Sequence, residues 1–280
     1  MLTRKVFLAS AVLSGGRLAT RFLDMIAALV VARFLTPAEF GMVALAIALL
    51  MTLRALTELP VSEALIRGED LTRSDIDTAF TLSLLRGVVV AGLLAAAAWP
   101  MGRIYDDSRL VDLTLVLAIA PLAMALRSPQ LVRFTREVNY LPVTLLDTGT
   151  RLAGFLVSVA LAFATGSYWA LAVGLIVPPL IAAPISYLIA PYRPRLSLAS
   201  WRTILSFAGW LSLARFIATV NGEIDRFFIG GVLGKAAVGF FAMGRSVATT
   251  TSWAIGIPLM QAMFPGFARI KSEPDRSRVA

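Results

Sequence analysis

Long apolar runs follow one another along the whole 280-residue chain, separated by short segments that collect proline, glycine and charged residues. A helix needs about 20 mainly apolar residues to cross a bilayer. The pattern predicts eight helices, at 6–32, 38–59, 78–101, 110–126, 141–165, 168–190, 203–231 and 236–266, with the longest connections at 60–77 and 127–140. We therefore expect an all-α polytopic membrane protein with about eight transmembrane helices.

The composition agrees with this fold class and narrows the chemistry. Hydrophobic residues make up 58% of the chain, more than a soluble domain needs. Cysteine and histidine are absent, which excludes disulfides and thiol chemistry and removes the commonest metal ligand. We expect no metal site and no organic cofactor, and any proton coupling would have to use Asp or Glu. The net charge of +9 does not indicate nucleic acid as a partner, because the basic residues do not form one soluble patch.

The basic residues predict the orientation instead, since loops on the cytoplasmic side of a membrane are enriched in Lys and Arg. Fourteen of them fall on one side of the predicted spans: Arg4, Lys5, Arg67, Arg73, Arg127, Arg133, Arg136, Arg193, Arg195, Arg202, Arg269, Lys271, Arg276 and Arg278. Four fall on the other side: Arg33, Arg103, Arg109 and Lys235. This asymmetry predicts that both termini are cytoplasmic.

A shift of 198 residues superposes the first two predicted helices on the last two. Nine identities occur without a gap between residues 13 and 52, and they include Arg17 with Arg215 and Gly41 with Gly239. Six helices separate the copies, so the repeat would be parallel, about an axis along the membrane normal. The repeat predicts a six-helix lobe at 1–196, the first helix pair of an incomplete second lobe at 197–268, and a cytoplasmic tail at 269–280. On this interpretation the chain is a fragment or a truncated product of a protein with at least twelve helices.

Eight arginines interrupt the predicted helices. They are Arg17, Arg21, Arg54, Arg86, Arg151, Arg215, Arg226 and Arg245. A charged side chain at mid-bilayer costs about 2.5–3.5 kcal/mol on insertion scales, so such residues face a bundle interior or a water-filled cavity. A cavity rich in arginine is suited to a large anionic ligand.

The strongest ligand candidates lie on polar stripes at helical spacing. One stripe comprises Ser14, Arg17, Arg21 and Asp24, and the predicted helix at 203–231 has a similar one of Ser212, Arg215, Thr219 and Arg226. Alternatives remain open for three other arginines. Arg151 could form an intrahelical ion pair with Asp147, Arg226 could pair with Glu223 or Asp225, and Arg54 could extend its head to the membrane surface.

Four segments carry a family resemblance. They are Arg33–Ala46 (RFLTPAEFGMVALA), Val61–Thr72 (VSEALIRGEDLT), Asp225–Gly234 (DRFFIGGVLG, followed by AVGFFA at 237–242) and Phe264–Ile270 (FPGFARI). In their order and spacing the segments resemble the oligosaccharide flippases of the multidrug/oligosaccharidyl-lipid/polysaccharide superfamily, close to the lipopolysaccharide and exopolysaccharide exporters. That family often has a Gln before the Arg of the second segment, which this chain lacks, and it has twelve to fourteen helices.

The resemblance implies a function as well as a fold. It implies two lobes around a cationic lumen, which move an undecaprenyl-pyrophosphate-linked oligosaccharide across the bacterial inner membrane by alternating access. The product would serve lipopolysaccharide, capsule or exopolysaccharide biosynthesis. Partners would be the lipid-linked anionic oligosaccharide, membrane lipids and the polysaccharide polymerase or glycosyltransferase machinery. Lumen residues that bind the substrate would be Arg17, Arg21, Arg54, Arg86, Arg215 and Arg245. Coupling to H⁺ or Na⁺ would use Asp24, Asp147 or Glu223.

Two other functions stay open as alternatives. A multidrug-type, cation-coupled exporter would have an acidic lumen, whereas arginines outnumber acids inside these helices. A polysaccharide polymerase or ligase would need a sizeable outer loop for catalysis, and the predicted outer loops have at most about ten residues. The sequence also lacks a recognisable catalytic triad or glycine-rich phosphate loop, so we expect a transporter and not an enzyme.

Overall fold

The computed structural model describes residues 2–67, 71–202, 208–250 and 252, and throughout these ranges the regular structure is helical. The elements are α1 (Leu2–Ala32), α2 (Pro37–Leu56), α3 (Val61–Arg67), α4 (Arg73–Ile104), α5 (Ser108–Leu117), α6 (Ile119–Ala125), the 3-10 helix η1 (Pro129–Leu131), α7 (Val132–Arg136), α8 (Leu141–Thr165), α9 (Trp169–Ile189) and α11 (Ala208–Leu233), followed by a helix at 235–250. This architecture confirms the all-α fold class.

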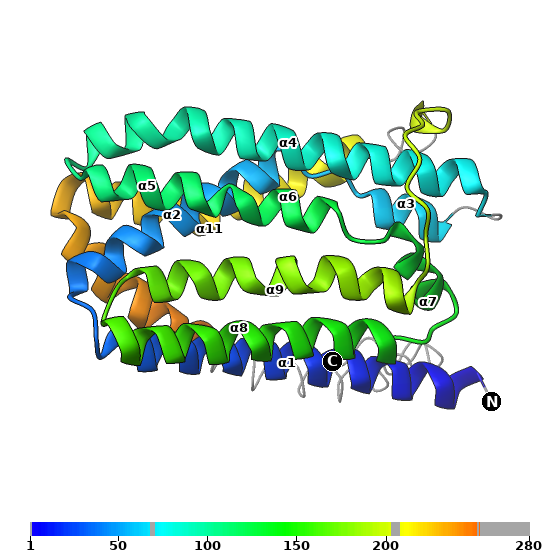
Figure 1. Cartoon of the computed structure of the whole chain (residues 1–280), viewed down its shortest axis with the longest axis horizontal. Helices are drawn as coiled ribbons and strands as arrows, with labels where there is room; N and C mark the ends of the chain where they lie inside the picture. Colours follow the sequence, from blue (N-terminus) through cyan, green and yellow to red (C-terminus); the bar gives the residue numbers. More distant parts are fainter. Residues whose placement is uncertain (1, 68–70, 203–207, 251, 253–280) are drawn as a thin grey trace, which may run out of the picture.

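The long helices run beside one another as a bundle (Figure 1). α1 packs against α8, α8 against α9, and α9 against α6, while α4 covers α5 and α6 and α11 packs against α2. α4 and α1 form opposite edges of the bundle in this view. We call the end with α3 and α7 the α3 end, and the end with the connection between α4 and α5 the Asp107 end.

Within the described ranges, five helical segments are long and apolar enough to cross a membrane. They are Pro37–Leu56, Arg73–Ile104, Ser108–Ala125 (α5 and α6 together), Leu141–Thr165 and Trp169–Ile189. α1 and α11 have 31 and 26 residues, so they are also long enough, but they carry the charged stripes. These findings support a polytopic membrane protein. The total of eight spans stays a prediction, because residues 203–207 and 253–266 of two predicted helices lie outside the described ranges.

The helices begin and end at local signals. Thr36 caps α2 by accepting a hydrogen bond from the amide of Glu39, and the Glu39 carboxylate accepts one from the amide of Thr36. Thr72 and Asp75 form the same reciprocal cap on α4. α8 ends at Gly166, whose φ of 59° is left-handed and costs glycine little.

Two expectations about elements were wrong in detail. The predicted helix at 110–126 is broken at Ala118 into α5 and α6, because Pro121 has no amide to donate to the carbonyl of Leu117. The predicted connection at 60–77 contains α3 and the first turn of α4, and the one at 127–140 contains η1 and α7. Helices this short carry too little apolar periodicity to be recognised in a sequence.

α2 and the helix at 235–250 meet at glycines that are 198 residues apart. A Cβ atom on Gly41 would lie 1.8 Å from the carbonyl oxygen of Lys235, and one on Gly239 would lie 2.0 Å from the carbonyl oxygen of Pro37. Pro37 and Lys235 are also 198 residues apart, so the contact is reciprocal. Reciprocal contacts of this kind arise between equivalent elements across a two-fold axis. The division into two lobes stays a prediction. Two lobes related by such an axis would produce a reciprocal contact of this kind.

Candidate functional site

A cavity of about 510 Å³ lies inside the bundle, between α1, α2, α8, α9, α11 and the helix at 235–250. Its walls are largely apolar, but five charged side chains line it: Arg21, Asp24, Arg151, Glu223 and Arg226. The hydroxyl-bearing residues Ser158 and Ser246 also line it. Three arginines and two acids from three helices therefore line one partly open cavity, which has an excess of positive charge.

The acids of the cavity are bound by its arginines. Arg151 Nη1 of α8 lies 3.3 Å from Asp24 Oδ1 of α1, so this pair joins two helices. Arg226 binds Glu223 one turn earlier on α11, and each of these side chains is only 16% exposed. The Nε atom of Arg226 is buried without a hydrogen-bond partner among the described atoms. A guanidinium with an unused N–H can donate it to an anionic oxygen with little rearrangement.

The structure places the candidates of the first stripe differently. Arg17, Arg21 and Asp24 are all exposed, but Arg21 and Asp24 line the cavity and Arg17 is not among its lining residues. Close to Arg17, α1 packs tightly on α8, since a Cβ on Gly16 would lie 2.1 Å from a Thr144 methyl group.

Arg215 lies at the α3 end and not in the cavity wall. Its Nη1 donates to Glu58 Oε1 at 2.6 Å and its Nη2 to Glu63 Oε1 at 2.7 Å. These two hydrogen bonds join α11 to the chain after α2 and to α3. Arg245 of the helix at 235–250 lies 3.9 Å from Asp225 Oδ2 of α11.

Arg54 and Arg86 line a separate cavity of about 140 Å³ between α2, α4 and α6. Arg86 Nη2 donates to the backbone carbonyl of Arg54 at 2.9 Å, one of the last carbonyls of α2. Such carbonyls have no partner within their own helix, so Arg86 stabilises the end of α2. The six candidate arginines thus lie in several places and not in one.

The alternative of an intrahelical pair between Asp147 and Arg151 was wrong, because both bind residues of other segments. Asp147 Oδ1 lies 2.8 Å from Arg127 Nη2, while Arg151 binds Asp24. Arg151 and Arg226 were not among the predicted substrate-binding residues. Arg226 is indeed paired with Glu223, yet both arginines line the cavity. No sequence pattern indicated this for Arg151, because it depends on the packing of α1 against α8.

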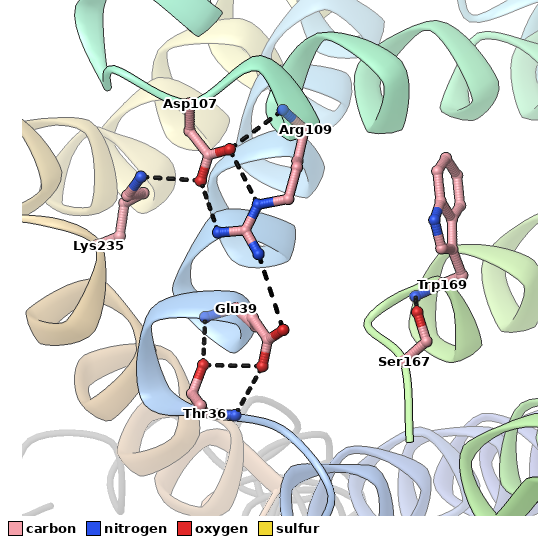
Figure 2. A network of polar contacts seen from close by, with 7 residues as sticks. All are labelled: Thr36, Glu39, Asp107, Arg109, Ser167, Trp169 and Lys235. Carbon is pink, nitrogen blue, oxygen red and sulfur yellow. Dashed lines mark hydrogen bonds and ion pairs between the residues drawn. The ribbon is translucent and has the colours of Figure 1, made fainter. Parts of the chain in front are cut away.

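A polar network joins three segments at the Asp107 end (Figure 2). Asp107 accepts hydrogen bonds from Arg109 Nε at 3.1 Å, Arg109 Nη2 at 3.0 Å and Lys235 Nζ at 2.8 Å. Arg109 also lies 3.8 Å from Glu39, the capping residue of α2. The hydrogen bond from Arg109, aided by Lys235, lowers the pKa of Asp107 to about 2 against the opposing effect of burial. The network fastens α2 and the helix at 235–250 to the connection between α4 and α5.

The described residues contain no group of three or more acids that could hold a metal ion. The chemistry of the cavity is that of charge-assisted hydrogen bonding by guanidinium groups. Arginine donates paired hydrogen bonds whose geometry matches carboxylate and phosphate oxygens. The charged groups of this cavity are therefore of the kind that suits an anionic ligand.

Comparison with known protein families shows to which family the chain belongs. The profile of a family described as Polysaccharide biosynthesis protein matches residues 30–280. The chain belongs to this family. The match confirms the resemblance to polysaccharide flippases and, with the apolar helices, establishes a multi-pass membrane protein of polysaccharide biosynthesis.

A curated relative is the lipopolysaccharide biosynthesis protein WzxC of Escherichia coli (strain K12), which is 22% identical over 265 residues. The aligned part covers 92% of this chain and 53% of the relative, so the chain spans about half the length of that protein. No solved structure matches the chain.

Proposed function

We propose that the chain forms part of a flippase that moves an undecaprenyl-pyrophosphate-linked oligosaccharide across the bacterial inner membrane. Family membership supports a role in surface polysaccharide biosynthesis and favours transport over catalysis. The observation that carries the proposal is the cavity that Arg21, Arg151 and Arg226 line. Guanidinium groups from three helices would bind the pyrophosphate, and the lipid chain would stay in the bilayer.

The mechanism we propose is alternating access. In the arrangement described, Arg215 fastens α11 to Glu58 and Glu63 at the α3 end. Access to the cavity from that end would require these two ion pairs to separate. Access from the opposite end would require the Asp107 network to separate. We take the α3 end to be cytoplasmic, because the predicted cytoplasmic arginines Arg73, Arg133 and Arg193 lie there.

Coupling to H⁺ or Na⁺ is part of the proposal for two of the three candidate acids. Asp24 and Glu223 line the cavity and bind arginines that would also serve the ligand. Neutralising either acid would release its arginine toward the pyrophosphate. Asp147 binds Arg127 and is not among the lining residues, so we propose no coupling role for it.

Binding of undecaprenyl pyrophosphate to the purified chain tests the proposal. Arg21→Gln should weaken binding by about 10–100-fold, because one hydrogen bond to a charged group contributes about 1.5–3 kcal/mol. The double change Arg151→Gln with Asp24→Asn removes the pair without altering net charge and should weaken binding similarly. Arg33→Gln, an exposed arginine at the Asp107 end, is the matched control.

Unchanged affinity in both cavity variants would refute the cationic site. A loss confined to Arg54→Gln with Arg86→Gln would instead assign the ligand to the smaller cavity. Transport by the assembled protein, measured as surface polysaccharide in cells, should follow the same order as binding.

A further inference from the structure

We propose that a third cavity, at the α3 end, binds the phosphate of an anionic headgroup. This cavity has a volume of about 560 Å³ and shares no lining residue with the charged cavity described above. Its arginines are Arg73 at the start of α4, Arg133 in α7 and Arg193 after α9. Gln130 and Tyr187 add further polar groups to the wall. Three arginines from widely separated parts of the chain thus line the same cavity.

The wall that carries Arg193 is firmly built. Tyr192 is buried, and its hydroxyl donates to Asp77 Oδ1 of α4 at 2.7 Å. Its ring stacks on Tyr187 with 6.4 Å between centroids. Farther along, the amide of Ser197 donates to Thr81 Oγ1 at 2.9 Å, and that of Ser200 to Thr78 Oγ1 at 3.2 Å. The segment after α9 is thus fastened along α4, which fixes the position of Arg193 beside the cavity.

The charge balance of this cavity favours an anion. Among its described lining residues there are three arginines and no carboxylate. The acid next to them, Asp77, is engaged by Tyr192 and lies 3.9 Å from Arg73. A general excess of basic residues on one face explains positive charge there, but it does not explain why arginines of three segments line a single cavity. A guanidinium group can donate two parallel hydrogen bonds to phosphate oxygens. Tyrosine and glutamine side chains can donate to the remaining oxygens.

The location favours a phospholipid as the source of the phosphate. The cavity lies at the ends of α4 and α9, two of the helices suited to crossing a membrane. Leu188, the residue after Tyr187 on α9, is 81% exposed, so the same end of α9 offers apolar surface to an acyl chain. Basic pockets between transmembrane helices at a membrane surface bind anionic headgroups.

Native mass spectrometry of the full chain in detergent tests this site, with phosphatidylglycerol and phosphatidylcholine as probes. We expect selective retention of phosphatidylglycerol, and Arg133→Gln with Arg193→Gln should weaken it about tenfold or more. Both side chains are exposed, so the variant should fold, which circular dichroism will verify. Arg202→Gln, an exposed arginine at the same end that stacks on Trp201, is the control and should leave binding unchanged.

A second variant separates a defined site from general surface charge. Arg133→Lys with Arg193→Lys keeps the charge but loses the paired hydrogen bonds, so it should retain only part of the selectivity. Equal binding by the wild type and the glutamine variant would overturn the proposal, as would an equal loss in Arg202→Gln.

Inorganic phosphate distinguishes the two sources of the anion. If the lipid is the ligand, millimolar phosphate should leave phosphatidylglycerol bound. If phosphate binds alone and displaces the lipid with the same dependence on Arg133 and Arg193, the phosphate chemistry is supported and the ligand is soluble. Retention of neither probe would refute the site.

Discussion

The two ends of α11 are fastened by different kinds of contact. Near the Asp107 end, the hydroxyl of Tyr105 donates to the carbonyl of Phe227 at 3.1 Å, and Lys235 binds a nearly buried Asp107. The glycine contact between α2 and the helix at 235–250 lies close by. At the α3 end, Arg215 binds two carboxylates, and these three side chains are 28–39% exposed. Close-packed neighbouring helices and a buried carboxylate therefore surround one end of α11, whereas partly exposed ion pairs hold the other.

This difference indicates which end opens at lower cost. Exposed ion pairs contribute about 0–1 kcal/mol, because water competes for both partners. Separating close-packed backbones and buried charges costs more. We therefore expect the described arrangement to be firmly closed at the Asp107 end and weakly closed at the α3 end.

The largest expected effect comes from filling the glycine contact. Gly239→Ala would place a methyl group 2.0 Å from the Pro37 carbonyl, so the helices must move apart. Overpacking of this kind costs about 1–3 kcal/mol, and we expect a clear fall in the thermal unfolding temperature measured by circular dichroism.

Gly244→Ala is the matched control on the same helix, because its Cβ would meet nothing within 4 Å. Alanine there should stabilise by up to about 1 kcal/mol. If both variants shift the unfolding temperature in the same direction, the close contact is not what holds this end.

Asp107→Asn should lower stability by a similar amount. The change leaves Arg109 and Lys235 without their shared carboxylate, and hydrogen bonds to charged groups contribute about 1.5–3 kcal/mol. Denaturant unfolding should therefore shift toward lower concentration. Asp112→Asn, an exposed acid on α5, is the control and should change the midpoint little.

The same carboxylate predicts a pH dependence. The pKa of Asp107 is about 2 in the folded protein, below the usual value near 3.9, so the folded state favours the ionised form. This contribution is complete above about pH 4 and is lost as the pH falls toward 2. Unfolding measured across this range should show a steeper loss of stability in the wild type than in Asp107→Asn. Parallel curves would show that Asp107 does not stabilise this end.

Hydrophobic spacing was sufficient to predict most of the helices. The predicted range 141–165 coincides with α8, and the range 168–190 differs from α9 by one residue at each end. The features that the hydrophobic pattern did not predict have local causes. The break at Ala118 follows from one proline, and α3 and α7 are too short to show a period.

The cavity could be predicted only in part, because helical spacing identifies a face but not its neighbour. Arg21 and Asp24 were expected to share a polar face of α1, and both line the cavity. Arg17 belongs to the same stripe yet does not line the cavity, since a stripe does not show where along the helix its neighbours leave a space. Arg151 reaches the cavity because α8 packs against α1. Whether any of these residues binds the ligand stays a prediction.

The smallest expected effect on stability, and the sharpest test of the comparison, is Arg215→Gln. Because its ion pairs are partly exposed, their loss should cost at most about 1 kcal/mol and change the unfolding temperature little.

The same change, Arg215→Gln, should loosen the α3 end and make the cavity more accessible. The chain has no cysteine, so Ser246→Cys in the cavity wall provides a single reporter thiol. Its labelling by a bulky water-soluble maleimide should accelerate in the Arg215→Gln background and not in the Arg202→Gln background. If Arg215→Gln instead destabilises the protein as much as Asp107→Asn while labelling stays constant, then the two ends are held equally and the α3 end is not the one that opens.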